Sequence, residues 1–231
     1  MCPFSLPNLT MSSFDPALTP IDALGGEPPV DARRLDPSWL RERFTQSFPW
    51  TPEFTEDKAW RESPPTPVPA AVLIPLVNHP QGMTLLLTLR TAHLTDHAGQ
   101  ISFPGGRVDP EDHDPIATAL RETEEEIGLS RQHIEIIGTL PDYLTGTGFR
   151  VTPVVALIQP PFELAADTFE VAEIFEVPLA FLMDGSNHQR RSAEFPNRTG
   201  RRSFYAMPFE NYFIWGATAS MLRNLYHFLR A

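Results

Sequence analysis

Residues 105–129 read GGRVDPEDHDPIATALRETEEEIGL and predict one well-bounded acidic helix. Asp114 followed by Pro115 is a typical helix start, with a capping carboxylate and then proline at the first helical position. Gly128 is a typical stop, since glycine readily adopts the left-handed conformation that follows a last helical turn. We therefore expect a helix from about residue 115 to residue 127.

This predicted helix has two faces at about 100° per residue. The less polar face holds Ile116, Leu120, Thr123 and Ile127. The other face holds Glu122, Glu125 and Glu126, whose spacing of i, i+3 and i+4 places three carboxylates within about one turn of each other.

Three neighbouring carboxylates repel one another, by a few tenths of a kcal/mol per pair on an exposed helix and by more where burial removes water. Arg121 is the one cation inside the predicted helix, and it can reach Glu125 at i+4. The cluster is typical of a divalent-cation site, since Mg²⁺ prefers carboxylate and water oxygens. A solvated acidic face would show the same residues, so the helix alone leaves both interpretations open.

The glycines before the helix favour the cation site. In Phe103-Pro104-Gly105-Gly106, the glycine pair follows a short predicted strand. Two glycines without side chains let the backbone pass close to a ligand and leave carbonyl groups accessible to a metal. We therefore expect Gly105 and Gly106 to line the same site as the acidic helix.

At this point the stretch resembles the Nudix box, G-x5-E-x7-R-E-U-x-E-E-x-G-U, in which U is a bulky aliphatic residue. The second half of the box matches at Arg121-Glu122, Glu125-Glu126 and Gly128-Leu129. Asp112 stands where the box has its first Glu, and Thr123 stands where an aliphatic residue is usual. The segment from Asp112 to Arg121 is one residue longer than the general pattern, a spacing found in the coenzyme A pyrophosphatase branch.

The preceding residues 86–106, LLTLRTAHLTDHAGQISFPGG, are similar to the signature of that branch, LLTxR-[SA]-x3-R-x3-G-x3-FPGG. Two positions depart from the signature, because Thr91 replaces Ser or Ala and Thr95 replaces an arginine. Further resemblance to the branch lies in residues 145–155, 169–182 and 213–222, so that it covers roughly residues 70–225.

The resemblance implies an α/β fold, a Nudix-type α/β/α sandwich with a mixed β-sheet between helices. It implies a hydrolase that uses Mg²⁺ or Mn²⁺ to cleave the diphosphate bond of coenzyme A or its thioesters into 3′,5′-ADP and a 4′-phosphopantetheine. Two alternatives stay open at this point. One is a Nudix hydrolase of another nucleoside diphosphate derivative, such as ADP-ribose or a dinucleoside polyphosphate. The other is an inactive Nudix module that binds a nucleotide.

The resemblance also implies roles for individual residues. Metal ligands are expected at Glu122 and Glu126, with Glu125 as a third ligand or as the catalytic base. Arg121 is expected to orient Glu125. A further catalytic acid from outside the box is expected at Glu170, with Glu173 as the alternative.

Substrate phosphates need local cations in a chain whose formal net charge is −11. Arg90, at the end of a predicted strand, can hold a phosphate with two parallel hydrogen bonds. Arg107 follows the glycine pair, and Arg150 opens another predicted strand. Any of the three can take the place of the arginine that is missing at Thr95.

Proline-rich segments divide the rest of the chain. We expect residues 1–37 to be a disordered or loosely docked arm. Residues 38–69 are expected to hold a short helix through Phe44 and a Pro-rich connector, and residues 70–231 the hydrolase domain. Strands are expected at residues 70–77, 83–90, 134–140, 151–158, 175–179, 203–207 and 212–215, and a second core helix at residues 217–229.

Composition restricts the partners and the location. The negative net charge argues against nonspecific nucleic-acid binding, because phosphates would be repelled. No apolar run approaches the ~20 residues that span a bilayer, and the first residues do not resemble a signal peptide. Cys2 is the only cysteine, which excludes an internal disulfide. We expect a cytoplasmic monomer or homodimer that acts on a small nucleotide-diphosphate substrate.

Overall fold

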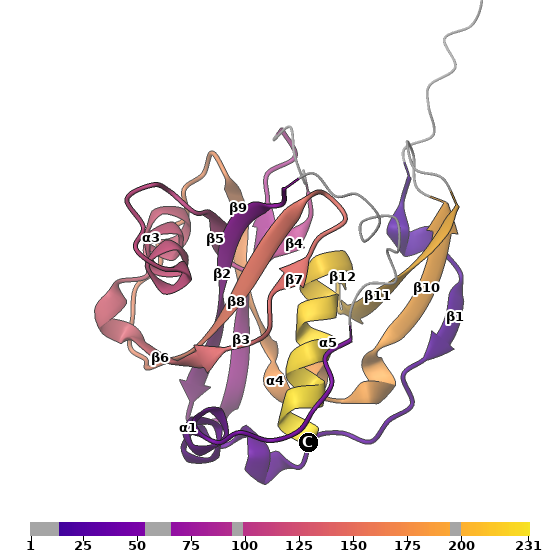
Figure 1. Ribbon diagram of the computed structural model, residues 1–231, viewed down its shortest axis with the longest axis horizontal. Coiled ribbons are helices and arrows are strands. Elements are labelled where there is room, and N and C mark those ends of the chain that lie inside the picture. The colour runs from indigo at the N-terminus through magenta and orange to yellow at the C-terminus, as the bar shows by residue number, and fades with distance from the viewer. Residues whose placement is uncertain (1–13, 54–65, 94–98, 195–199) are drawn as a thin grey trace, which may run out of the picture.

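The computed structural model describes residues 14–53, 66–93, 99–194 and 200–231. Its main element is an eight-stranded mixed sheet with the order β4-β3-β2-β8-β6, to which β5, β7 and β9 attach through β2, β8 and β3. The strands of this sheet are β2 Val68–His79, β3 Gly82–Arg90, β4 Ile101–Ser102, β5 Gly105–Arg107, β6 Ile134–Thr139, β7 Tyr143–Leu144, β8 Phe149–Ile158 and β9 Val171–Pro178. The sheet separates α3, Pro115–Ile127, from α5, Gly216–Arg230 (Figure 1).

Strand β2 lies at the centre of the sheet. It pairs with β3 across the predicted hairpin turn and runs parallel to β8 from Val68 opposite Phe149 to Val77 opposite Ile158. Its side chains alternate between two buried clusters, with Ala71, Leu73 and Val77 on the α3 side and Ala70, Ile74 and Leu76 on the α5 side. Burial of both faces explains why this strand reads as an unbroken apolar run rather than as an alternating one.

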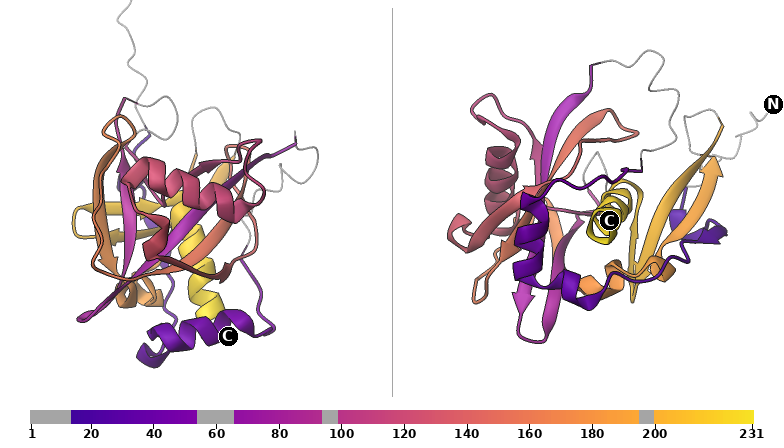
Figure 2. Two further views of the ribbon diagram at one scale, coloured as in Figure 1. Left: turned by 90° about the vertical axis from the view of Figure 1, so that its left-hand side faces the viewer. Right: turned by 60° about the horizontal axis from the view of Figure 1, so that its bottom comes forward.

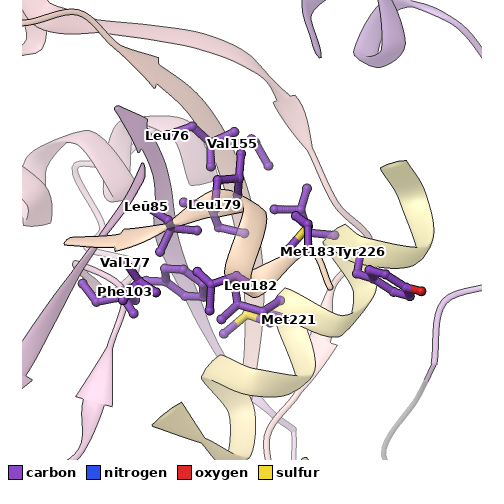
Figure 3. Packing of buried hydrophobic residues seen from close by; sticks show 14 of the residues in the cluster. Leu76, Leu85, Phe103, Val155, Val177, Leu179, Leu182, Met183, Met221 and Tyr226 are labelled. Carbon is purple, nitrogen blue, oxygen red and sulfur yellow. The ribbon is translucent and has the colours of Figure 1, made fainter. Parts of the chain in front are cut away.

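The larger cluster fills the space between the sheet and α5. Figure 3 shows Leu76, Leu85, Val155 and Val177 of the sheet together with Met221 of α5 and with Leu179 and Leu182 of the short helix α4, Leu179–Leu182. The smaller cluster joins Ala119 and Ile127 of α3 to the opposite face. The expected arrangement of a mixed sheet between helices is therefore confirmed.

A second sheet lies beyond α5. Its four antiparallel strands have the order β1-β10-β11-β12, with the bounds β1 Ile21–Leu24, β10 Gln189–Glu194, β11 Arg201–Phe209 and β12 Tyr212–Trp215. Figures 1 and 2 show these strands on the side of α5 that faces away from the eight-stranded sheet. The strands predicted at residues 203–207 and 212–215 are thus present, but they belong to a sheet that local sequence patterns did not reveal.

The N-terminal residues that the structure describes contact both the second sheet and α5. Strand β1 pairs with β10, the Gly25 N–H donates to the His188 carbonyl at 2.6 Å, and Val30 is buried. Glu27 forms an ion pair with Arg223, a residue of α5 that is only 4% exposed. Of the two alternatives expected for residues 1–37, disordered or loosely docked, the described residues 14–37 form a docked segment, and Glu27 contributes to this because a buried arginine requires an acidic partner. The division of the chain into domains stays a prediction. Residues 1–13 lie outside the described residues.

The next segment forms the short helix that the sequence predicts, α1 at Pro37–Thr45. The Asp36 side chain caps it by accepting from the Ser38 N–H at 2.8 Å, and Leu40 is fully buried. The predicted connector at residues 61–69 falls mostly outside the described residues, and the chain is already strand β2 from Val68. In the described residues, no helix is long and apolar enough to span a membrane.

The strand predicted at residues 175–179 is longer at one end and shorter at the other. Strand β9 runs from Val171 to Pro178, and Leu179 begins helix α4. The start of β9 matters for the site, because the residues before Val171 contact α3. The Asp167 N–H donates to the Glu126 carbonyl at 2.9 Å.

Candidate functional site

Helix α3 begins and ends where the sequence predicts. The Asp114 carboxylate accepts from the Ala117 N–H at 2.7 Å, which satisfies one of the free donors of the first turn. Gly128 ends the helix with φ 68°, and its N–H donates to the Glu124 carbonyl at 3.0 Å. The helix is therefore fixed at both ends, which fixes the height of its carboxylates above the sheet.

The carboxylates of α3 differ strongly in exposure. The side chain of Glu125 is 60% exposed, that of Glu122 is 20% exposed and that of Glu126 is 6% exposed. Glu126 therefore lies on the buried side of the helix with Thr123 and Ile127. The face that the sequence assigns to the three acids therefore includes a buried member, because this part of the helix faces a glycine turn whose lack of side chains leaves room for a carboxylate.

Gly105 and Gly106 make that room. The Gly105 N–H donates to the Glu126 carboxylate at 3.1 Å. A β-carbon added at Gly106 would lie 2.5 Å from the Glu122 carboxylate. A β-carbon added at Gly105, whose φ is 150°, would lie 2.4 Å from the Ala71 carbonyl of β2. Both glycines are thus required by close approach, of the acids on one side and of β2 on the other.

Arg121 binds four partners, one of them the backbone of Arg107 directly after the glycine turn. Its guanidinium donates to Asp112 at 2.9 Å, to Glu125 at 2.9 Å and to the Arg107 carbonyl at 3.2 Å, and it pairs with Glu122 at 2.9 Å. The predicted contact with Glu125 is present. Arg121 therefore holds Glu122 and Glu125 side by side.

Asp112 is the residue that sequence reasoning left out of the site. It accepts from Arg121 and from the Thr118 hydroxyl at 2.9 Å, and its own loop closes when its carboxylate accepts from the Asp109 N–H at 2.9 Å. The hydrogen bonds from Arg121 hold the pKa of this carboxyl well below its usual range. Its place at the first acid of the Nudix-box resemblance indicated that Asp112 belongs to the site. Only the folded loop shows that its task is to position Arg121.

Arg90 joins three elements of the site. It ends β3, and its guanidinium lies 3.4 Å from the Glu126 carboxylate of α3 and 3.6 Å from the carboxylate of Glu170, which precedes β9. The structure thus brings Glu170 to the acidic helix. It does not bring Glu173, whose carboxylate accepts from the Tyr212 hydroxyl at 2.6 Å, where Tyr212 stacks on Phe175 of the α5-side core.

Burial makes the two inner acids reluctant to ionise. Desolvation raises the pKa of Glu126 to about 7, and the nearby charges of Glu122 and Glu170 add to the increase. The Gly105 N–H and Arg90 oppose this increase without overcoming it. Desolvation likewise raises the pKa of Glu122. The site therefore holds more negative charge than its own cations neutralise.

The other two candidate arginines contact different groups. The Arg107 guanidinium lies 5.2 Å over the ring of Phe149, and Arg150 lies 3.7 Å from the Asp142 carboxylate. Arg150 also lines a cavity of about 390 Å³ next to Asp114 and Pro115 at the start of α3. Thr95 lies outside the described residues.

The residues present fit a divalent cation that brings its own water. Within the described residues, no three His, Cys, Asp or Glu side chains are arranged so that they could hold a metal ion together. Glu122, Glu126 and Glu170 nevertheless lie close together, since the charges of the neighbouring glutamates raise the pKa of both Glu122 and Glu126. Hard carboxylate oxygens with an excess of negative charge suit Mg²⁺ or Mn²⁺, since Mg²⁺ usually keeps several waters and takes only one or two carboxylates.

The NUDIX domain model matches residues 67–194. Proteins of Salmonella newport and Salmonella agona, both named "Uncharacterized Nudix hydrolase NudL", are 46% identical over 157 residues, which cover 68% of this chain and 80% of theirs. Among solved structures, a C. elegans Ap4A hydrolase binary complex aligns at 23% identity and a TM-score of 0.40 over 48% of this chain and 80% of that chain. The NUDIX domain of Shewanella oneidensis NrtR complexed with ADP ribose aligns at 21% identity and a TM-score of 0.39, over 55% of this chain and 85% of that chain.

Proposed function

The chain belongs to the Nudix hydrolase family, and on that premise we propose that it cleaves the diphosphate bond of coenzyme A or its thioesters with Mg²⁺ or Mn²⁺. The products are 3′,5′-ADP and a 4′-phosphopantetheine. The observation that carries the hydrolytic part is the buried acid pair, Glu122 and Glu126, set against the Gly105-Gly106 turn. Two carboxylates whose arginine partners do not offset the cost of their burial suit a cation-binding role better than a structural one.

Glu122 and Glu126 would hold the metal, because their oxygens face the glycine turn with the least water around them. When bound, a divalent cation offsets the charge of the diphosphate and makes an attacking water more acidic. Gly105 keeps the Glu126 carboxylate in one orientation through its N–H. Arg121 fixes Glu122 relative to Glu125 through a guanidinium that Asp112 holds in place.

Two acids can take the proton of the attacking water. Glu125 is exposed and held by Arg121, so it presents a carboxylate to solvent in a fixed place beside Glu122. Glu170 comes from outside the helix, is 42% exposed and reaches the same site through Arg90. A base must lie within hydrogen-bond reach of the water that attacks. Glu125 serves as a third ligand or as the base, and Glu170 as the further catalytic acid.

Replacing Gly106 by Ala tests how closely the turn sets Glu122. The added methyl group would overlap the Glu122 carboxylate, which must then move. Because the clash is with the far end of a flexible side chain, we expect melting temperature to change little while kcat falls by about tenfold or more, as a displacement of about 1 Å can cost. Thermal melting and steady-state kinetics check this, and full activity in the variant would show that Glu122 has no fixed role.

The coenzyme A assignment is supported by the similarity of residues 86–106 to the branch signature. Coenzyme A carries a 3′-phosphate that ADP-ribose lacks, and an acidic protein needs a local cation to bind it. Arg90 is engaged with Glu126 and Glu170, so we assign this task to Arg107 or Arg150, whose contacts are a ring face and one exposed carboxylate.

We expect kcat/KM for coenzyme A to exceed that for 3′-dephospho-coenzyme A and for ADP-ribose by about tenfold or more, since one charge-assisted contact contributes roughly 1.5–3 kcal/mol. The three compounds are compared with Mg²⁺ and with Mn²⁺, and the products are identified by mass. Arg107→Met and Arg150→Met form a matched pair, and the variant that removes the preference identifies the contact. If ADP-ribose is the better substrate, the coenzyme A assignment is wrong and hydrolysis of another nucleoside diphosphate derivative takes its place.

That alternative substrate class has one observation in its favour, the threonine at position 95 where the branch signature has arginine. An inactive nucleotide-binding module is disfavoured by the acids themselves. Burial opposes the ionisation of these carboxylates, and a module that only binds a nucleotide has no use for such acids. Metal-dependent release of phosphate-containing products separates both enzymes from the inactive module.

A further inference from the structure

The backbone of Arg90 is fixed in the sheet, whereas its guanidinium, here called its head, is loosely held. Its backbone N–H donates to the Gln100 carbonyl at 3.0 Å, and the residue pairs with Val171 of β9, so its backbone is part of the sheet. Its guanidinium, by contrast, reaches its two carboxylates only at 3.4 and 3.6 Å. Arg121 in the same site makes its carboxylate contacts at 2.9 Å. Charge-assisted hydrogen bonds are normally 2.7–2.9 Å long, so the contacts of Arg90 are weak for their kind.

The Nε–H of Arg90 is also unused. Within the described part of the chain, it is the one buried side-chain nitrogen or oxygen without a hydrogen-bond partner. Buried donors normally have partners, and an exception calls for an explanation. In this position Arg90 leaves one donor unused and makes two long contacts. This indicates that its guanidinium can bind better in another position, with a different partner.

The head lies where a divalent cation would also bind. It lies between Glu126 of α3 and Glu170, and it offsets the repulsion of carboxylates that come from separate elements. A hard cation is attracted to the same oxygens. Because one guanidinium carries a single charge, a divalent cation meets the surplus of negative charge more completely than Arg90 can.

We propose that Arg90 is a substrate-binding residue that also acts as a removable counter-ion. Its guanidinium holds Glu126 and Glu170 together while the site is free of metal, and it releases them to a divalent cation. The released N–H groups, Nε–H included, then donate to the diphosphate. This inference rests on the proposed function, and it adds that metal binding and substrate binding are coupled through one side chain.

Competition predicts that loss of Arg90 strengthens metal binding and weakens substrate binding. We expect Arg90→Met to lower the Kd for Mn²⁺ by about threefold or more, measured by calorimetry without substrate. Under saturating Mn²⁺, the same variant should raise KM for coenzyme A by about tenfold, with a smaller change in kcat. Arg90→Lys keeps the charge and should bind Mn²⁺ within about twofold of the wild type, while it lacks the planar fork for the diphosphate.

Arg131→Met is the matched control, because it removes one positive charge beside α3 where Arg131 pairs with the outward-facing Glu124 at 3.2 Å. It should change Mn²⁺ affinity by less than about twofold, since exposed charges are screened. A disrupted site would weaken Mn²⁺ and substrate binding together, so that result would overturn the inference, as would unchanged Mn²⁺ affinity in Arg90→Met or equal tightening in Arg131→Met. If the wild type binds Mn²⁺ but cleaves no diphosphate, the proposed function fails, while the competition for Mn²⁺ is still measured.

Discussion

Glu126→Gln and Glu122→Gln are each expected to lower kcat for diphosphate hydrolysis by at least about 100-fold. A neutral amide binds Mg²⁺ poorly, so either change removes one of the two innermost metal-binding oxygens. Gln keeps the size of Glu, and its amide oxygen can still accept from the Gly105 N–H that holds Glu126. The loss should therefore come from the site and not from the fold.

Glu124→Gln is the matched control for both variants. Glu124 lies on the same helix, is 50% exposed and pairs with Arg131 across the outer surface. Kinetics with Mg²⁺ and with Mn²⁺, together with melting temperatures, should place Glu124→Gln with the wild type and the other two variants at least about 100-fold lower in kcat. Turnover close to wild type in Glu126→Gln or Glu122→Gln would remove these residues from the metal site.

Local signals in the sequence were sufficient for the helix that carries the acids. Asp114 and Gly128 cap α3 in the way that their residue types predict, and Arg121 meets Glu125 at the expected spacing. The hairpin of β2 and β3 follows from two apolar runs around His79 and Gly82 for the same reason. These features depend on neighbours in the chain, so a pattern of residues is enough to predict them.

Contacts between distant segments could not be read in this way. Helical periodicity grouped Glu126 with Glu122 and Glu125, but it cannot show that Glu126 is buried against a glycine turn. The pairing of Glu27 with Arg223 and the position of Arg90 between Glu126 and Glu170 join residues from separate elements. Phosphate binding by Arg90 was predicted from its place at a strand end, and only the folded chain shows that two carboxylates also contact its guanidinium.

Ionisation of Glu126 is expected to lower the stability of the metal-free protein as pH rises from about 5 to about 8, and Glu126→Gln should lack this contribution. Burial raises the pKa of Glu126 from 4.5 to about 7. Between these values the folded protein keeps a proton that the unfolded chain has released, so an increase in pH favours unfolding. The shift corresponds to a loss of about 3 kcal/mol in the free energy of unfolding once Glu126 is ionised in both states.

Urea unfolding in EDTA at several pH values measures this effect as the difference between the wild type and Glu126→Gln. The difference should change by about 3 kcal/mol across the window, with the variant becoming the more stable protein at the alkaline end, because it carries no buried charge there. Histidines and other groups titrate in both proteins and largely cancel, and Glu124→Gln should follow the wild type. Saturating Mg²⁺ should restore the stability of the wild type above pH 7 and not that of Glu126→Gln, since the cation supplies the counter-charge that the ionised carboxylate lacks. Parallel curves for the wild type and Glu126→Gln would mean that water or a cation of the protein already neutralises Glu126, and a metal role for it would lose its electrostatic basis.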